Sequence, residues 1–392
     1  MALKAGVVVI GGGVTGASIA FHLAKRGLRD VVVVEKNFLA SGATGKSSAC
    51  VRQHYSTPET CRMVLKSLHF FERFEELTSG RTASFVRTGY LLGVDDRLRR
   101  QMEASVALQQ SAGISTRLVS PAEMRELEPR LRTDDLVAGC YEPESGYADP
   151  SQTTQGFAGA ARDLSVRTME QAEVLAVLTR GDRIAGVRTS KGEIEAPIVV
   201  NAAGTWGDRI GRMVGLEIPI TVCRHKINFI AWPQEARRPH PLVYDFVTNI
   251  YTRPETGGLI LVGSLDSEEL HDRADPDGYA EGVTFDETLD ALGRIAQRFP
   301  VLEQGSVAKG YAGCFDVTPD WHPILDSVGP DGFYVAAGFS GHGFKLSPAV
   351  GEMMAELIAE GPRPGSDVSA FRLSRFAEGK PIRGTYGDWL MC

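Results

Sequence analysis

The stretch VVVIGGGVTG, residues 7–16, joins a short apolar run to three spaced glycines. The run is β-branched and uninterrupted, which is typical of a parallel strand buried on both faces. Apolar residues at helical spacing follow as far as Arg26, and Gly27 is a plausible helix stop. Residues 31–34, VVVV, have the character of a second buried strand. The sequence therefore opens with a βαβ unit and predicts an α/β fold.

Gly11, Gly13 and Gly16 have the spacing of a turn that binds a dinucleotide. The first glycine allows the tight bend, the second lets a pyrophosphate approach the backbone, and the third lets helix and strand pack closely. Val14 and Thr15 begin the helix, where free N–H groups and the helix dipole favour the phosphates. The turn therefore predicts a dinucleotide site.

Glu35 and Lys36 stand at the end of the second strand. A carboxylate at this place accepts hydrogen bonds from an adenosine ribose, which favours NAD or FAD over NADP. The motif does not separate NAD from FAD, and a glycine-rich turn without any ligand is the structural alternative.

Composition and charge narrow the classes of partner. The chain has 392 residues, enough for two domains, and a net charge of −7 without a long block of like charges. We therefore expect no nucleic-acid partner. No apolar run is long enough to span a membrane, and a strand beginning near Val7 leaves no room for a signal peptide. The six cysteines form no CxxC pair and no metal-ligand spacing, so we expect reduced thiols, no metal site and a cytoplasmic location.

Two further stretches decide which dinucleotide is expected. Residues 41–48 read SGATGKSS, and residues 338–345 read GFSGHGFK between a strand-like and a helix-like apolar run. Together with the opening turn they resemble the D-amino-acid-oxidase/sarcosine-oxidase family of FAD enzymes. Within it the chain is most similar to sarcosine oxidases and to the β-type subunits of sarcosine oxidase and proline dehydrogenase complexes. The other matching stretches, in the family's order, are GYADPSQTTQGFAGAAR, VVNAAGTWGD, RPETGGLILVGS and VTPDWHPILD.

The resemblance implies that FAD is the cofactor. Covalent members of the family attach it through a cysteine, but Gly313 stands at that position here and Cys314 follows it. We therefore expect FAD to be bound without a covalent bond. Besides the residues of the opening unit, the expected FAD contacts are Ser41, Gly42, Ala43, Thr44, Ser47, Ser48, Val174, Ala203, Gly204, Trp206, Gly338, Ser340, Gly341, His342, Gly343 and Lys345.

The GFSGHGFK loop has residues suited to the edge of a flavin ring. Reduced flavin carries negative charge along its pyrimidine edge, and the backbone N–H groups of glycines reach that edge because no side chain blocks them. Ser347 is a good N-cap and Pro348 a good first helical residue. We therefore expect a helix to begin just behind the loop, with its positive end near the ring.

The resemblance also implies a reaction. It is oxidation of the C–N bond of a small secondary or N-methyl amino acid, sarcosine-like or proline-like, by hydride transfer to flavin N5 and hydrolysis of the resulting imine. Arg52 and Lys345 are expected to bind the substrate carboxylate, with a surface salt bridge as the alternative for Arg52. Tyr251 is expected to shape the substrate pocket, and a core tyrosine is the alternative. His342 is expected near the flavin, or else as a structural histidine.

The strand-like stretch 259–263, LILVG, departs from the family. Monomeric sarcosine oxidases carry a lysine there that helps oxygen to react, and this chain does not. The electron acceptor is therefore either O2, reacting slowly, or another protein or a second flavin, in a hetero-oligomer with partner subunits. The alternatives are a flavin-binding electron-transfer subunit of a hetero-oligomeric amine dehydrogenase, and a primary D-amino acid or glycine oxidase. An NAD-dependent dehydrogenase explains residues 7–35 and leaves the two later motifs unexplained.

The distribution of motifs predicts two interleaved domains. Residues 1–88, 146–216 and 305–392 are expected to form a dinucleotide-binding FAD domain like that of glutathione reductase. Residues 89–145 and 217–304, with more charge and antiparallel strand patterns, are expected to form a substrate domain with a mixed or antiparallel sheet. The active site is expected at the junction of the two domains.

Overall fold

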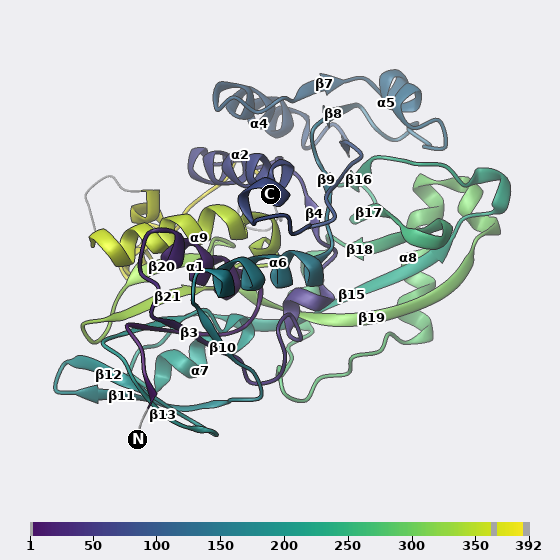
Figure 1. Cartoon of the computed structure of the whole chain (residues 1–392). Coiled ribbons are helices and arrows are strands. Elements are labelled where there is room, and N and C mark those ends of the chain that lie inside the picture. The colour runs from purple at the N-terminus through teal and green to yellow at the C-terminus, as the bar shows by residue number, and fades with distance from the viewer. Residues whose placement is uncertain (1–2, 362–366, 387–392) are drawn as a thin grey trace.

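The computed structural model describes residues 3–361 and 367–386, and four sheets carry the fold (Figure 1). The six-stranded sheet contains the glycine-rich turn, and its strands pair in parallel except at one edge, where the last two are antiparallel. This arrangement confirms the α/β class. Its strands, in order, are β10 (Arg167–Met169), β3 (Val31–Val34), β2 (Val7–Ile10), β14 (Ile198–Asn201), β21 (Phe333–Ala337) and β20 (Ile324–Ser327).

Both faces of the six-stranded sheet are covered. In β2, Val7 and Val9 join the core formed with the helices, while Val8 and Ile10 pack on the opposite side. This alternation confirms the interpretation of VVVI as a strand buried on both faces. The helices, which lie together in Figure 1, are α1 (Val14–Lys25), α2 (Pro58–Glu72), α6 (Pro150–Asp163) and α9 (Gly343–Glu360). The opposite side carries a four-stranded sheet of β1 (Leu3–Lys4), β13 (Gly192–Glu195), β12 (Arg183–Thr189) and β11 (Val174–Arg180).

An eight-stranded, mostly antiparallel sheet forms the second half of the molecule. Its two longest strands run side by side from this half towards the six-stranded sheet (Figure 1). Its strands, in order, are β19 (Ser306–Val317), β15 (Thr221–Ala231), β18 (Leu259–Ser264), β17 (Ile250–Glu255), β16 (Leu242–Asp245), β6 (Tyr90–Val94), β8 (Ala138–Glu142) and β7 (Arg117–Val119). The helices α4 (Arg99–Ser111), α5 (Pro121–Leu127) and α8 (Phe285–Arg298) pack against it. The fourth sheet is small and consists of β4 (Cys50–Val51), β9 (Gly146–Tyr147) and β5 (Val86–Arg87).

The division into two domains stays a proposal, with one change to a boundary. Segments 89–145 and 217–304 supply every strand of the eight-stranded sheet except β19. That strand pairs with β15 from Ser306 to Val317, although the sequence predicted residues from 305 onward to lie in the FAD domain. We propose that the last segment of the FAD domain begins after Val317.

Helix α9 begins earlier than the sequence predicts. Its N-cap is His342, so the GFSGHGFK loop runs directly into the helix and Ser347 and Pro348 lie inside it. Pro348 has no N–H to donate to the carbonyl oxygen of Phe344. The Ser347 hydroxyl donates to that oxygen instead, at 2.8 Å, so the helix tolerates the proline. Ser347 therefore repairs the helix rather than capping it.

None of the helices within residues 3–361 and 367–386 is long and apolar enough to cross a membrane.

Candidate active site

Two adjoining cavities lie between the six-stranded sheet and the eight-stranded sheet. The larger, of 570 Å³, opens where β2, β3 and β14 end, and Ile10, Val34 and Ala202, the residue after β14, line it. The smaller, of 120 Å³, reaches towards β15 and β17. Parallel α/β sheets bind ligands at the carboxyl ends of their strands, so the position of the larger cavity fits a nucleotide site. Residues that line both cavities are Thr15, Ala43, Thr44, Lys46, Gly204, Cys314 and Phe339.

The glycine-rich turn leaves room where a dinucleotide backbone would pass. Gly11 has a φ of +112°, and a Cβ added there would lie 2.3 Å from the carbonyl oxygen of Ala202. A Cβ on Gly16 would lie 2.0 Å from the carbonyl oxygen of Gly11. Gly13 lines the larger cavity, where a side chain would take up space. These positions match the three roles that glycine has in a pyrophosphate-binding turn.

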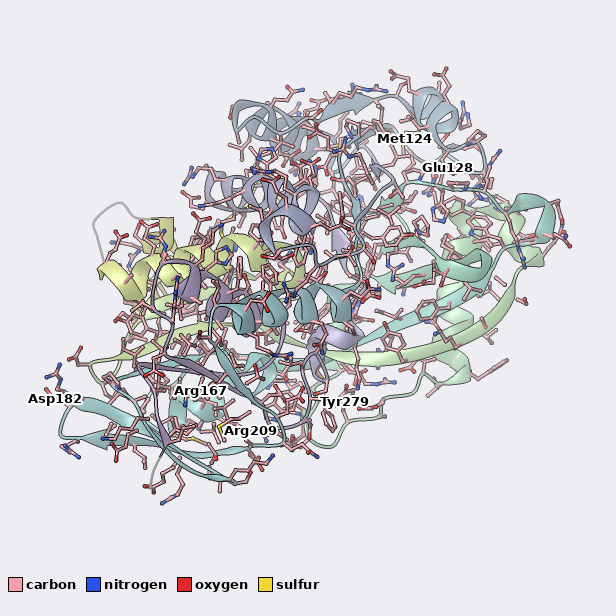
Figure 2. The ribbon with its side chains drawn as sticks, in the orientation of Figure 1. Met124, Glu128, Arg167, Asp182, Arg209 and Tyr279 are labelled. Atoms are coloured by element: carbon pink, nitrogen blue, oxygen red, sulfur yellow. The ribbon has the colours of Figure 1, made fainter. Side chains whose placement is uncertain are left out.

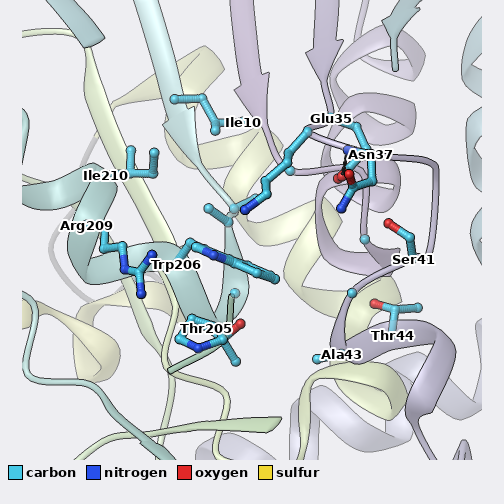
Figure 3. A pocket seen from close by; sticks show the side chains of 18 of the residues that line it. Ile10, Glu35, Asn37, Ser41, Ala43, Thr44, Thr205, Trp206, Arg209 and Ile210 are labelled. Carbon is cyan, nitrogen blue, oxygen red and sulfur yellow. Dashed lines mark hydrogen bonds between the residues drawn. The ribbon is translucent and has the colours of Figure 1, made fainter. Parts of the chain in front are cut away.

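Polar and cationic side chains face one another across the larger cavity (Figure 3). The Glu35 carboxylate accepts the backbone N–H of Gly12 and of Asn37, both at 2.7 Å, which holds it at the end of β3. On the opposite side Arg209 and Trp206 come from the turn and helix after β14. This donor set fits the adenosine ribose and the phosphates of a dinucleotide.

A loop from the eight-stranded half, residues 276–281, lines one side of the larger cavity. Asp277 accepts hydrogen bonds from Lys36, Arg209 and, at 3.0 Å, the Trp206 indole. Tyr279 of the same loop lines the cavity near Arg209 (Figure 2). The sequence predicted that Lys36 and Trp206 lie at this site but did not predict the loop. No motif in the loop indicates that it contacts residues so distant in the sequence.

Most of the expected FAD contacts line a cavity. Gly16, Gly338 and Ser340 do not, and each shapes the backbone instead. The backbone N–H of Gly338 donates to the Asp316 carboxylate at 2.9 Å, and the Ser340 hydroxyl accepts the backbone N–H of Thr318 at 3.1 Å. The expected contacts that line one or both cavities are Gly11, Gly13, Val14, Thr15, Glu35, Lys36, Ser41, Gly42, Ala43, Thr44, Ser47, Ser48, Val174, Ala203, Gly204, Trp206, Gly341, His342, Gly343 and Lys345.

The four expected catalytic residues all line the smaller cavity. Arg52 and Lys345 are buried, with 1% and 6% of their surfaces exposed, so Arg52 is not part of a surface salt bridge. Burial, Lys345 and Arg52 together hold the pKa of His342 well below its ordinary value, so this ring is neutral. His342 Nδ1 lies 3.0 Å from the Tyr55 hydroxyl. Two cations beside a neutral histidine make the smaller cavity attractive to an anion.

Arg52 lies between two aromatic rings, and its charge acts on the buried carboxyl group of Glu142. Its guanidinium carbon lies 4.8 Å from the centre of the Tyr55 ring and 5.2 Å from that of Tyr244. Glu142, fully buried behind it, accepts the Ser145 hydroxyl at 2.6 Å and the backbone N–H of Gln53 at 2.8 Å. Burial raises the pKa of Glu142 to about 7, although both hydrogen bonds and Arg52 act to lower it.

We expect Glu142→Gln to change how the free energy of unfolding depends on pH. A carboxyl group whose pKa rises from 4.5 to about 7 on folding favours the folded state while it is protonated. The wild type should therefore lose about 3 kcal/mol relative to the variant as the pH rises through this window. Urea unfolding of both proteins at about pH 4 and about pH 8 measures the difference. A difference that is constant over pH would contradict the assignment.

A hydrogen-bonded chain of three side chains begins at Tyr251. His225 Nε2 lies 2.8 Å from the Tyr251 hydroxyl, and His225 Nδ1 lies 2.6 Å from the Glu269 carboxylate. The His225 ring also stacks on Phe315, with ring centres 4.2 Å apart. Tyr251 and His225 line the smaller cavity, and burial raises the pKa of Tyr251 well above its ordinary value. The sequence predicted Tyr251 alone, because only folding brings β15, β17 and the turn after β18 together.

Gly313, which stands where covalent members of the family carry the attaching cysteine, is also in the site. Gly313 lines the smaller cavity, and Cys314 lines both. Burial raises the pKa of Cys314 to about 11, so its thiol is protonated at neutral pH and is a poor nucleophile. The non-covalent attachment of FAD stays a prediction, and the state of this thiol supports it.

Comparison with known proteins identifies the family. The family of FAD-dependent oxidoreductases designated DAO matches residues 6–357. The chain belongs to this family. Its cofactor is therefore FAD, as the sequence predicted, and the alternative of an NAD-dependent dehydrogenase is set aside. The larger cavity and its glycine turn are where this FAD protein would hold the adenosine and pyrophosphate, and the adjoining smaller cavity is left for the flavin ring and a substrate.

Individual relatives have names that refer to amino-acid oxidation. The chain is 29% identical to mitochondrial sarcosine dehydrogenase of Mus musculus, over 95% of this chain and 41% of that protein. It is 25% identical to the sarcosine oxidase subunit beta of Rhodobacter capsulatus, over 96% of this chain and 89% of that protein. Among solved structures, L-proline dehydrogenase from P. horikoshii superimposes with a TM-score of 0.89 at 31% identity, over 97% of this chain and all of that chain. The chain thus spans less than half the length of sarcosine dehydrogenase.

Proposed function

We propose that this FAD protein oxidises the C–N bond of a small secondary or N-methyl amino acid. The observation that carries the proposal is the pair of buried cations, Arg52 and Lys345, in a cavity that also presents the Tyr251 hydroxyl. Two cations can bind a carboxylate, and a tyrosine oxygen can accept a hydrogen bond from an amine beside it. The names of sarcosine dehydrogenase and L-proline dehydrogenase, both similar to this chain, support this substrate class.

The residues of the cavity would orient the amino acid and exclude water. Arg52, stacked between Tyr55 and Tyr244, cannot swing to solvent, so a bound carboxylate would have one position. When bound, FAD supplies the hydride acceptor for this reaction. Burial of Arg52 and Lys345 strengthens their attraction for an anion, because few water molecules compete with it.

The next question is which molecule accepts the electrons from the reduced flavin. We propose a partner protein or second flavin rather than O2 alone, because β18 carries no lysine facing the site. Lys46 lines both cavities, but its ammonium group is bound by Tyr279 and Glu281, both at 2.5 Å. The similarity to a sarcosine oxidase subunit beta supports partner subunits. A cytoplasmic location stays a prediction.

The visible spectrum of the purified protein under anaerobic conditions tests the proposal. We expect a flavin band that sarcosine, L-proline or another N-methyl amino acid bleaches. Pyrrolidine, which is proline without its carboxylate, should bleach the band far more slowly. Bleaching by glycine or a D-amino acid instead would establish a primary amine oxidase. A band that no amine bleaches, but that a co-purifying flavoprotein reduces, would establish the electron-transfer subunit. Readmitted air then separates an oxidase from a dehydrogenase by the rate at which the colour returns.

A further inference from the structure

The chain Tyr251–His225–Glu269 connects the substrate cavity to a second opening behind the eight-stranded sheet. Successive residues of a strand point to opposite faces of the sheet. On β15, His225 lines the smaller cavity, whereas the next residue, Lys226, lines a separate cavity of 360 Å³, which we call the rear cavity. Glu269 lies in the 3-10 turn Ser267–His271 after β18 and also lines this rear cavity. Its side chain is 16% exposed, whereas that of His225 is 4% exposed. Exposure therefore increases along the chain of hydrogen bonds, away from the substrate.

We propose that Glu269 receives the proton that the substrate amine must lose and passes it to water in the rear cavity. The inference rests on the proposed function, because only an amine substrate needs to lose such a proton. An alkylamine resembles the lysine side chain, with an ordinary pKa of about 10.4, and so is protonated at neutral pH. Its nitrogen lone pair must be free before an imine can form. Loss of the proton is favoured here because Arg52 and Lys345 already place positive charge in the cavity.

The hydrogen bonds determine the direction of the transfer. A carboxylate oxygen accepts hydrogen bonds, so in the proposed relay His225 Nδ1 donates to Glu269, and Nε2 accepts the Tyr251 O–H. The amine N–H proton moves to the Tyr251 oxygen while the Tyr251 proton moves to Nε2. The Nδ1 proton moves to the Glu269 carboxylate. Tyr251 and His225 each gain one proton and lose one, the amine loses one positive charge, and Glu269 holds the proton until it releases it to water.

The surroundings of Glu269 suit release to solvent. The charged groups that face the rear cavity with it come from β15, the turn after β18 and α8: Lys226, Asp266, Glu268, Asp286, Glu287, Asp290 and Arg294. Arg294 is paired with Asp266 at 3.1 Å and with Asp290 at 2.8 Å. Glu268, which is 78% exposed, contacts His271 at 3.1 Å and does not contact His225. Among the acidic groups of this cavity that the structure describes, Glu269 is the one hydrogen-bonded to the His225 ring.

Glu269→Gln tests the relay, and Glu268→Gln, on the adjacent residue of the same cavity, is the matched control. We expect Glu269→Gln to slow anaerobic flavin reduction at neutral pH about a hundredfold. The pH profile of that rate should shift to alkaline values and approach the wild type where the amine is neutral in solution. Glu268→Gln should keep the wild-type profile. A Glu269→Gln profile equal to that of the wild type overturns the relay while leaving the proposed function intact.

A second measurement does not depend on turnover. Nitrogen-15 spectra of histidine-labelled protein report the tautomer of His225, identified by the signal that His225→Gln removes. We expect a protonated Nδ1 in the wild type and in Glu268→Gln, and an altered signal in Glu269→Gln. A protonated Nε2 with an unprotonated Nδ1 in the wild type would overturn the relay. A wild-type flavin that no secondary amino acid reduces would overturn the proposed function and this inference together.

Discussion

Arg52→Met should lower the efficiency of flavin reduction by a carboxylated amine about a hundredfold, with little change for the same amine without its carboxylate. Removing one partner of a buried, hydrogen-bonded charge pair weakens binding by about 3 kcal/mol. Because about 1.4 kcal/mol corresponds to a factor of ten in affinity, this loss is about a hundredfold. Arg52 is 1% exposed, so water cannot replace it as the partner of a carboxylate. Methionine keeps much of the length and apolar surface of arginine, so the rings of Tyr55 and Tyr244 keep a packing partner.

The measurement compares L-proline with pyrrolidine, or sarcosine with dimethylamine, by anaerobic rapid mixing. The ratio of the two efficiencies should be large in the wild type and close to one in Arg52→Met. Arg130→Met is the control, since the Arg130 side chain is only 7% exposed, pairs with Glu128 at 2.6 Å and lies 4.2 Å from the Trp232 ring. It lines neither cavity, so its ratio should stay that of the wild type. An unchanged ratio in Arg52→Met would remove Arg52 from carboxylate binding.

The glycine-rich turn could be predicted from sequence because its chemistry is local. Gly11, Gly13, Gly16 and Glu35 lie within one βαβ unit, and the geometry of that unit requires their positions. The resemblance of the later motifs to an FAD family added Arg52, Lys345, Tyr251 and His342, and these residues do line one cavity. Whether they act as proposed is left to the experiments above.

His225 and Glu269 could not be predicted in the same way. They are 44 positions apart in the sequence, and their contact depends on how β15 and the turn after β18 meet at the end of a sheet. A histidine and a glutamate in separate strand-like segments carry no pattern that distinguishes them from ordinary polar residues. The start of α9 was predicted wrong for a different reason: the favoured N-cap pair Ser347-Pro348 is used inside the helix, where the serine hydroxyl replaces a missing backbone donor.

Gly11→Ala should abolish retention of FAD, whereas Gly27→Ala should not. Both glycines flank α1 and have positive φ, +112° and +93°, so alanine is strained at each, typically by about 1 kcal/mol. The difference lies in the surroundings. A Cβ at Gly11 would lie 2.3 Å from the carbonyl oxygen of Ala202, whereas a Cβ at Gly27 meets nothing within 4 Å.

Relief of the clash at Gly11 requires β2 and β14 to move apart, because the obstacle is backbone and not a flexible side chain. These strands end beside the larger cavity, so their separation would displace the backbone N–H groups that would hold the pyrophosphate. A cofactor present at a thousand times its Kd stabilises the fold by about 4 kcal/mol, and Gly11→Ala should lose this contribution. The flavin-to-protein ratio after purification and the shift of Tm on adding FAD measure the effect. A yellow Gly11→Ala protein with the Tm of Gly27→Ala would show that this turn does not hold the cofactor.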